Sequence, residues 1–163
     1  MSFRSFRLPP GVDCWSSGSS VTISGKKGKV SFGCVTKICR KGDIVFFTPG
    51  LSKHESSILV KTVYGVVIGY SISLKLKGIG YRIEKTNDKL RFALGFSHPI
   101  ELRIPRDVFI SIKKKDFTLM SANYSLLRNF ATQIRSHRFP DPYKGGGILY
   151  EEEKVLRKEG KKT

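Results

Sequence analysis

The order of apolar and polar residues along the chain predicts two helices, each with one apolar stripe. Ser52 and Glu55 have the spacing of a capping box, so the first helix is predicted to begin at Ser52. Asn123 is a good N-cap, so the second is predicted to begin there. The residues predicted for the two stripes recur at helical spacing: Leu59, Val63, Val66, Val67 and Tyr70 in the first, and Leu126, Leu127, Phe130, Ala131 and Ile134 in the second. We expect both stripes to pack against sheets.

Between the helices, the sequence predicts a long hairpin from Leu74 to Pro105, with its turn at Asn87-Asp88. Apolar residues alternate with charged ones on both sides of this turn: Tyr81 and Ile83 before it, and Leu90, Phe92 and Leu94 after it. Such alternation is typical of an antiparallel sheet with one face in water.

A short motif occurs twice and indicates an internal duplication. Leu8-Pro9-Pro10-Gly11-Val12 precedes the strand patterns of the first half, and Ile104-Pro105-Arg106-Asp107-Val108 precedes a strand pair that leads into the second helix. We therefore expect an α+β fold of two similar small domains, each an antiparallel-rich sheet packed against one helix, followed by a basic C-terminal tail. The boundaries predicted are 1–71, for a shortened N-terminal domain, and 72–163.

The charge balance indicates a polyanionic partner. The 163 residues carry 30 Lys and Arg against 13 Asp and Glu, a net charge of +17 on 18.3 kDa, and such a surplus favours nucleic acid or an anionic membrane. The longest apolar run, Val63 to Tyr70, is far shorter than the roughly 18 residues of a membrane-spanning helix, so no membrane partner is expected. Both halves are basic, so we expect the polyanion to contact both.

Enzymatic chemistry is not indicated. A nuclease needs clustered carboxylates or a histidine pair, whereas the acidic residues here are scattered and His54, His98 and His137 fit solvated, hydrogen-bonding or phosphate-contacting roles better than catalysis. Gly78-Ile79-Gly80 lacks the third glycine and the helix of a dinucleotide fingerprint. We expect no cofactor and no small-molecule substrate.

The cysteines and the N-terminus add little chemistry. Cys14, Cys34 and Cys39 are odd in number and lack the CxxC pairs of zinc sites, so neither a disulfide framework nor a metal site is predicted. The first twelve residues contain no apolar segment typical of a secretion signal.

Residues 139–150, FPDPYKGGGILY, join two stiff prolines to three flexible glycines. Two interpretations stay open: an ordinary surface loop after a helix, or a backbone that a ligand approaches closely. The lysine runs at 26–29 and 113–115 fit either a solvated surface or contact with nucleic acid, and for 113–115 the solvated surface is favoured.

Several segments, in matching order and spacing, resemble the family of the universal sixth protein of the large ribosomal subunit. They are KGIGYR (Lys77 to Arg82), LGFSHPIE (Leu94 to Glu101), the helix end QIRSHR (Gln133 to Arg138), PDPYKGGGI (Pro140 to Ile148) and the tail YEEEKVLRKEGKKT. The first half resembles this family more loosely, through LPPGV and VTISGKKGKV, and it is shortened between Cys34 and Ser52.

The resemblance implies two similar α+β domains and no enzymatic activity. It implies binding to large-subunit rRNA near the sarcin-ricin loop and the base of the factor-recruiting stalk, beside neighbouring ribosomal proteins. In this family the second domain and the tail make most of the RNA contact, and glycines in the loop bring backbone N–H groups to phosphates or sugars. The RNA-binding residues implied here are Ser97, His98, Arg135, Arg138, Tyr143, Lys144, Gly145, Gly147, Arg157, Lys158, Lys161 and Lys162. Gly146 stands where the family usually has a second lysine.

We therefore expect a structural, rRNA-binding protein of the large ribosomal subunit. Another basic nucleic-acid-binding protein is the alternative, and a nuclease a more distant one. The shortened first domain, the 11 Phe and the lack of a targeting segment favour a ribosome of the mitochondrial matrix. Bacterial cytoplasm and plastid stroma are the alternatives.

Overall fold

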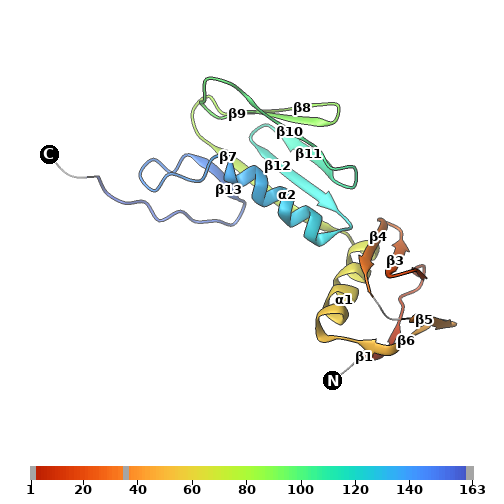
Figure 1. Cartoon of the computed structure of the whole chain (residues 1–163). Coiled ribbons are helices and arrows are strands. Elements are labelled where there is room, and N and C mark those ends of the chain that lie inside the picture. The colour runs from red at the N-terminus through yellow and green to blue at the C-terminus, as the bar shows by residue number, and fades with distance from the viewer. Residues whose placement is uncertain (1–2, 35–36, 161–163) are drawn as a thin grey trace. The chain divides into compact units, whose positions relative to one another are not determined.

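A computed structural model describes residues 3–34 and 37–160 (Figure 1). The elements follow in the order β1 (Phe3–Arg7), β2 (Asp13–Ser17), β3 (Ser20–Gly25), β4 (Gly28–Gly33), β5 (Lys37–Lys41), β6 (Ile44–Leu51), α1 (Lys53–Val67), β7 (Tyr70–Lys77), β8 (Arg82–Thr86), β9 (Lys89–Ala93), β10 (Ile100–Arg103), β11 (Phe109–Lys113), β12 (Asp116–Ser121), α2 (Tyr124–Ser136) and β13 (Gly147–Tyr150). The expected α+β class is confirmed.

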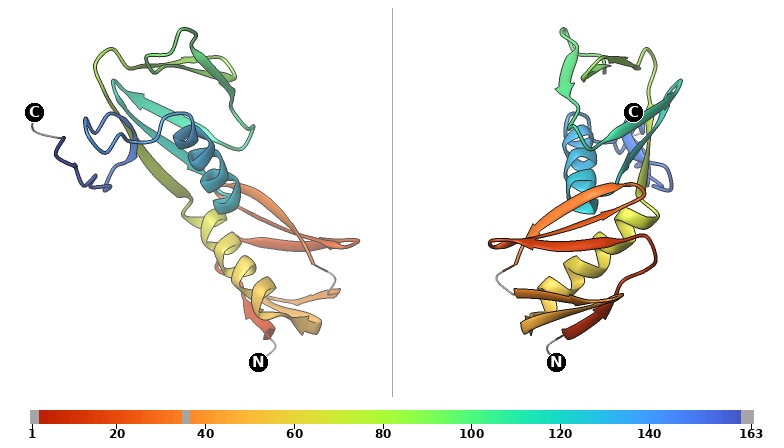
Figure 2. Two further views of the ribbon diagram at one scale, coloured as in Figure 1. Left: turned by 60° about the vertical axis from the view of Figure 1, so that its left-hand side comes forward. Right: turned by 90° about the vertical axis from the view of Figure 1, so that its right-hand side faces the viewer.

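The first structural unit comprises the chain up to Tyr70 together with Ser121–Tyr124. It contains two antiparallel sheets, in strand orders β1-β6-β5 and β2-β3-β4. Helix α1 contacts β3, β4 and β6, as Figure 2 shows for the yellow helix beside the red and orange strands. The core of this unit is mainly aliphatic, and its fully buried residues include Val21, Ile23, Val45, Leu51, Leu59 and Val66.

Helix α1 begins as the sequence predicts. The Glu55 N–H donates to the Ser52 hydroxyl, and the Ser52 N–H donates to the Glu55 carboxylate at 2.9 Å, which completes the capping box. Two donors lower the pKa of Glu55, first the Ser52 N–H and then the Ser52 hydroxyl, which donates to the same carboxylate at 2.8 Å. The cap therefore stabilises the helix above the unfolded pKa of about 4.3 and weakens as pH falls through the folded value. The apolar stripe of α1 is shorter than the sequence predicted, because the helix ends at Val67 and Tyr70 is the first residue of β7.

The second unit comprises Ser71–Met120 and the chain from Ser125 onward. Its sheets have the orders β10-β9-β8 and β11-β12-β7-β13. The predicted hairpin turn is confirmed, since Asn87-Asp88 joins β8 to β9 and Asn87 has a φ of 47°. Helix α2 begins at Tyr124, directly after the predicted cap, and buries Leu127, Phe130, Ala131 and Ile134.

The duplication is present, but its correspondence differs from the one that the motif suggested. Strand orders β1-β6-β5 and β2-β3-β4 recur as β7-β12-β11 and β8-β9-β10, each set followed by a helix. Residues 8–12 lie between β1 and β2, so their counterpart is the connection from β7 to β8, whereas residues 104–108 join β10 to β11. Each motif closes with a backbone hydrogen bond of the same kind. The Val12 N–H donates to the Pro9 C=O, and the Val108 N–H donates to the Pro105 C=O. The likeness therefore reflects shared turn chemistry at two different places in the repeat.

We predict that Ser52→Ala lowers the free energy of unfolding of the first unit by about 1 kcal/mol, the usual cost of losing a helix cap. The measurement is urea unfolding followed by emission of Trp15, the single tryptophan of the chain. Ser57→Ala, an exposed change within the same helix, is the matched control and is expected to leave stability unchanged or slightly higher. Equal midpoints for Ser52→Ala and the parent protein would contradict a contribution from the cap.

Candidate nucleic-acid interface

Three of the motif segments meet around one aromatic ring in the second unit. Tyr81 lies in the connection from β7 to β8. A Cβ added at Gly78 would lie 2.6 Å from the Tyr81 ring, one at Gly95 would lie 3.6 Å from it, and one at Gly146 would lie 4.0 Å from its hydroxyl. A side chain at Gly78 would therefore displace the ring. Gly146, which stands where a lysine is expected, faces the Tyr81 hydroxyl and the Lys77 C=O.

Arg138 lies between the Tyr81 ring and the connection from β9 to β10, which contains residues 96–99 (FSHP). Its guanidinium carbon lies 6.0 Å from the centre of the Tyr81 ring and 4.9 Å from that of Phe96, distances at which a cation interacts with an aromatic face. Phe96 is 47% exposed, and Ser97 and His98 beside it are also exposed. The structure thus places Arg138 against Phe96, which directly precedes the exposed Ser97 and His98 in the chain.

The loop after α2 is held by the carboxylate of Asp141. It accepts the N–H groups of Tyr143 and Lys144, both at 3.1 Å, and the Asp141 C=O accepts the N–H of Gly145 at 2.8 Å. The two N–H donors to the carboxylate are the main causes that lower the pKa of Asp141. The side chains of Tyr143 and Lys144 remain exposed. The loop therefore presents a ring and an ammonium group, while the N–H groups of Tyr143, Lys144 and Gly145 are already used.

Two glycines of this loop pack against other parts of the second unit. Gly145 and Gly147 are both buried. A Cβ added at Gly147 would lie 2.6 Å from the Pro140 Cα and 2.7 Å from the Phe139 carbonyl oxygen. Gly145 has a φ of +67° and faces the Arg157 side chain. Both glycines therefore lie against atoms of the protein itself, and the Gly145 N–H is already bonded to the Asp141 C=O.

Arg135 also has a different environment from the one expected. Its guanidinium donates to the Glu153 carboxylate and lies 5.2 Å from the centre of the Tyr150 ring and 5.7 Å from that of Phe139. Glu153 additionally accepts the Tyr150 N–H. Arg135 therefore ties the end of α2 to the segment after β13, and its charge is paired with that of Glu153.

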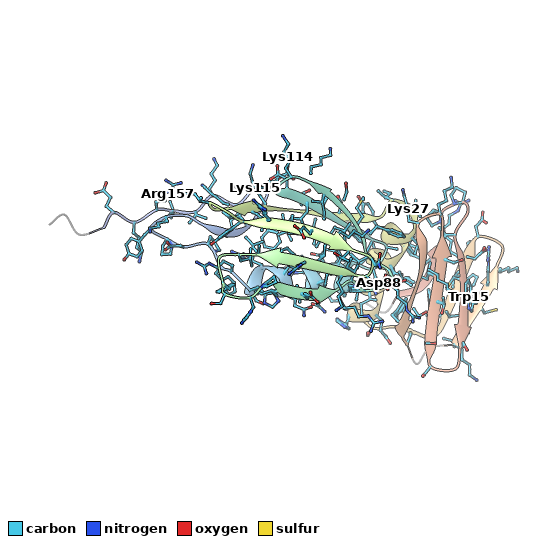
Figure 3. All side chains as sticks on the ribbon, turned by 90° about the horizontal axis from the view of Figure 1, so that it is seen from above. Trp15, Lys27, Asp88, Lys114, Lys115 and Arg157 are labelled. Carbon is cyan, nitrogen blue, oxygen red and sulfur yellow. The ribbon has the colours of Figure 1, made fainter. Side chains whose placement is uncertain are left out.

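The tail lies against the loop at its last described residues. The Lys158 N–H donates to the Pro142 C=O at 2.9 Å, and the Arg157 side chain covers Gly145. Both side chains are exposed (Arg157 is labelled in Figure 3). Lys161 and Lys162 lie outside the described residues.

Sequence reasoning missed two residues of this surface. Tyr81 and Phe96 lie within the motif segments but had no predicted RNA-binding role, although aromatic residues between cations are a signal for base stacking. Lys115, the last residue of the lysine run at 113–115, donates to the Gly78 C=O at 2.9 Å and so supports the connection that carries Tyr81. Beside Phe96, a shallow depression of about 300 Å³ is lined by Arg82, Glu84, Arg91, Ala93, Phe96 and Pro99.

In the described part of the chain, no group of three or more His, Cys, Asp or Glu side chains is placed to hold a metal ion. None of the described helices has the length and apolar character needed to cross a bilayer.

Comparison with known proteins places these observations in a family. The family profile of Ribosomal protein L6 matches residues 77–151, a range that holds every motif segment of the second half before the tail. Large ribosomal subunit protein uL6 of Limosilactobacillus reuteri is 38% identical over 170 residues, covering 98% of this chain and 96% of the relative. Protein uL6c of Phaeodactylum tricornutum is 36% identical, covering 94% and 93%, and uL6 of Cereibacter sphaeroides is 34% identical, covering 95% and 94%.

We predict that Gly147→Ala lowers the free energy of unfolding of the second unit by about 1–3 kcal/mol, because the new methyl group meets backbone atoms that side-chain motion cannot clear. Hydrogen exchange of the second-unit amides during urea titration measures the change. Gly160→Ala is the control, since no heavy atom lies within 4 Å of its added Cβ. Unchanged exchange in Gly147→Ala would show that the loop can adopt another packing.

Proposed function

The chain belongs to the ribosomal protein L6 family, and from this premise we propose that it is a structural component of the large ribosomal subunit that binds rRNA through its second unit. The family is one of ribosomal proteins and not of enzymes. The observation that carries the proposal is the convergence of the three motif segments on Tyr81, which gathers Arg138 and Phe96 into one surface.

The chemistry of this surface suits RNA. The Phe96 and Tyr143 rings, at 47% and 57% exposure, offer faces on which unpaired bases can stack. Lys144, Arg157 and Lys158 supply exposed cations for phosphates, and the Ser97 hydroxyl and His98 imidazole supply groups that hydrogen-bond to sugar or phosphate. We propose that these residues, with Arg138, contact rRNA, while Gly145 and Gly147 hold the loop in shape.

The position on the ribosome is the finer part of the proposal. From the family resemblance we place the contact near the sarcin-ricin loop and the stalk base, with other ribosomal proteins as neighbours. For the compartment, the three relatives compared above include two bacterial proteins and none described as mitochondrial. The mitochondrial matrix stays a prediction, with bacterial cytoplasm or plastid stroma as alternatives.

Sedimentation of ribosomal subunits from the source cells tests the function as a whole. Co-migration with the large subunit after a wash in moderate salt is the expected result. A basic nucleic-acid-binding protein of another kind would remain at the top of the gradient or follow other nucleic acid.

For the site itself, we predict that Lys144→Ala weakens binding to the cognate rRNA fragment by about 1 kcal/mol or somewhat more and reduces the salt slope of the binding constant by about one unit. The measurement is a filter-binding titration at several salt concentrations. Lys53→Ala, which removes an exposed charge at the start of α1, is the control with equal loss of net charge. Equal effects of the two variants would indicate bulk attraction and not a contact at the loop.

A further inference from the structure

The outward face of the β2-β3-β4 sheet consists mainly of small polar residues around one large ring. In the register of the three strands, its nine positions form three rows: Asp13, Ser24 and Lys29; Trp15, Thr22 and Ser31; Ser17, Ser20 and Gly33. The intervening residues Val21, Ile23 and Val30 point the other way into the core. Five of the eight positions around the tryptophan hold serine or threonine, and a sixth holds glycine.

Trp15 is partly exposed on this face. Its exposure is 44%, and its position on the sheet of the first unit is labelled in Figure 3. Directly across the ladder lies Thr22, whose hydroxyl is 3.0 Å from that of Ser31. Because these neighbours are small and bonded to each other, nothing beside the ring on this row is large enough to cover it.

The charge at the edge of the face is positive. Lys29 ends the first row, and Lys26 and Lys27 occupy the turn between β3 and β4. The acidic member of the face, Asp13, is paired with Arg40, whose guanidinium donates to its carboxylate at 2.8 Å. An anion that approaches the ring therefore meets lysines and a neutralised carboxylate.

We propose that this face is a stacking platform for an unpaired base of single-stranded RNA, with Trp15 beneath the base and Lys29 near the adjoining phosphate. Base–aromatic stacking with cations alongside is the usual way in which proteins hold single strands. A protein partner is disfavoured because an aromatic anchor in a protein interface is normally surrounded by further groups that exclude water, and the other eight positions of this face hold no large apolar side chain. The site lies in the first unit, so the inference stands beyond the RNA contacts proposed for the second.

The single tryptophan makes the platform directly observable. The full-length protein is titrated with single-stranded octa-adenylate RNA while Trp15 emission is recorded, and a fully paired, blunt-ended RNA duplex at the same phosphate concentration serves as comparison. Stacking predicts strong, saturable quenching by the single strand and little by the duplex, because a base paired in a duplex cannot stack on the ring. Equal quenching by both, or quenching that never saturates, would overturn the proposal.

Two variants that keep Trp15 test the neighbours. Thr22→Leu places a branched side chain beside the ring and is expected to remove most of the quenching. Lys29→Gln is expected to weaken binding and to reduce the salt slope of the quenching constant by about 0.7, the value for one cation on a single strand. Lys37→Gln, an exposed change on β5 outside this face, is expected to change neither the quenching nor its constant. Folding of each variant is checked by circular dichroism.

The outcome separates this inference from the function proposed above. If the protein binds its rRNA fragment but Trp15 emission never responds to single-stranded RNA, the platform is wrong and the ribosomal function stands. If octa-adenylate quenches Trp15 while the rRNA fragment does not bind, the platform stands and the ribosomal function is wrong.

Discussion

The return of the chain to the edge of β7 is the constraint on which the candidate interface depends. After α2, strand β13 pairs antiparallel with β7, with Gly147 opposite Lys77 and Ile148 opposite Leu76. Ile148 is fully buried, so this pairing is held by the core as well as by backbone hydrogen bonds. It brings the Gly-rich loop beside the β7–β8 connection, so that Tyr81 lies near glycines of its own segment and of two distant ones.

The acidic residues of this region serve the protein's own structure. Asp141 binds the backbone of the loop, and Glu153 binds Arg135 and the Tyr150 N–H. Each carboxylate removes N–H donors or a guanidinium from those available to a ligand, while Lys144 and Arg157 stay exposed. A chain with 30 basic and 13 acidic residues thus uses some of its few acids to fix the backbone that carries its exposed cations.

The two units share a topology and diverge at the C-terminal end of the helix. After α1 the chain continues into β7 of the second unit, whereas α2 is followed by the Gly-rich loop, β13 and the tail. Within the described residues, the first unit has no strand equivalent to β13. Most of the residues proposed to contact rRNA lie in or beside this addition, while the first unit offers a different surface around Trp15. The repeated topology supplies the scaffold, and the segments that differ between the two units supply the residues proposed to contact RNA.

The sequence by itself determined the features that depend on near neighbours. The capping box at Ser52, the turn at Asn87-Asp88 and the buried stripe of α2 arise from local bonding and periodicity, and all are present. The motifs were also sufficient to identify the family. Only the tertiary structure decided that Arg135 is paired with Glu153 and that Gly145 and Gly147 are buried. It also decided which strands correspond in the repeat, because pairing partners, burial and register arise from contacts between residues far apart in the chain, which composition and spacing do not encode.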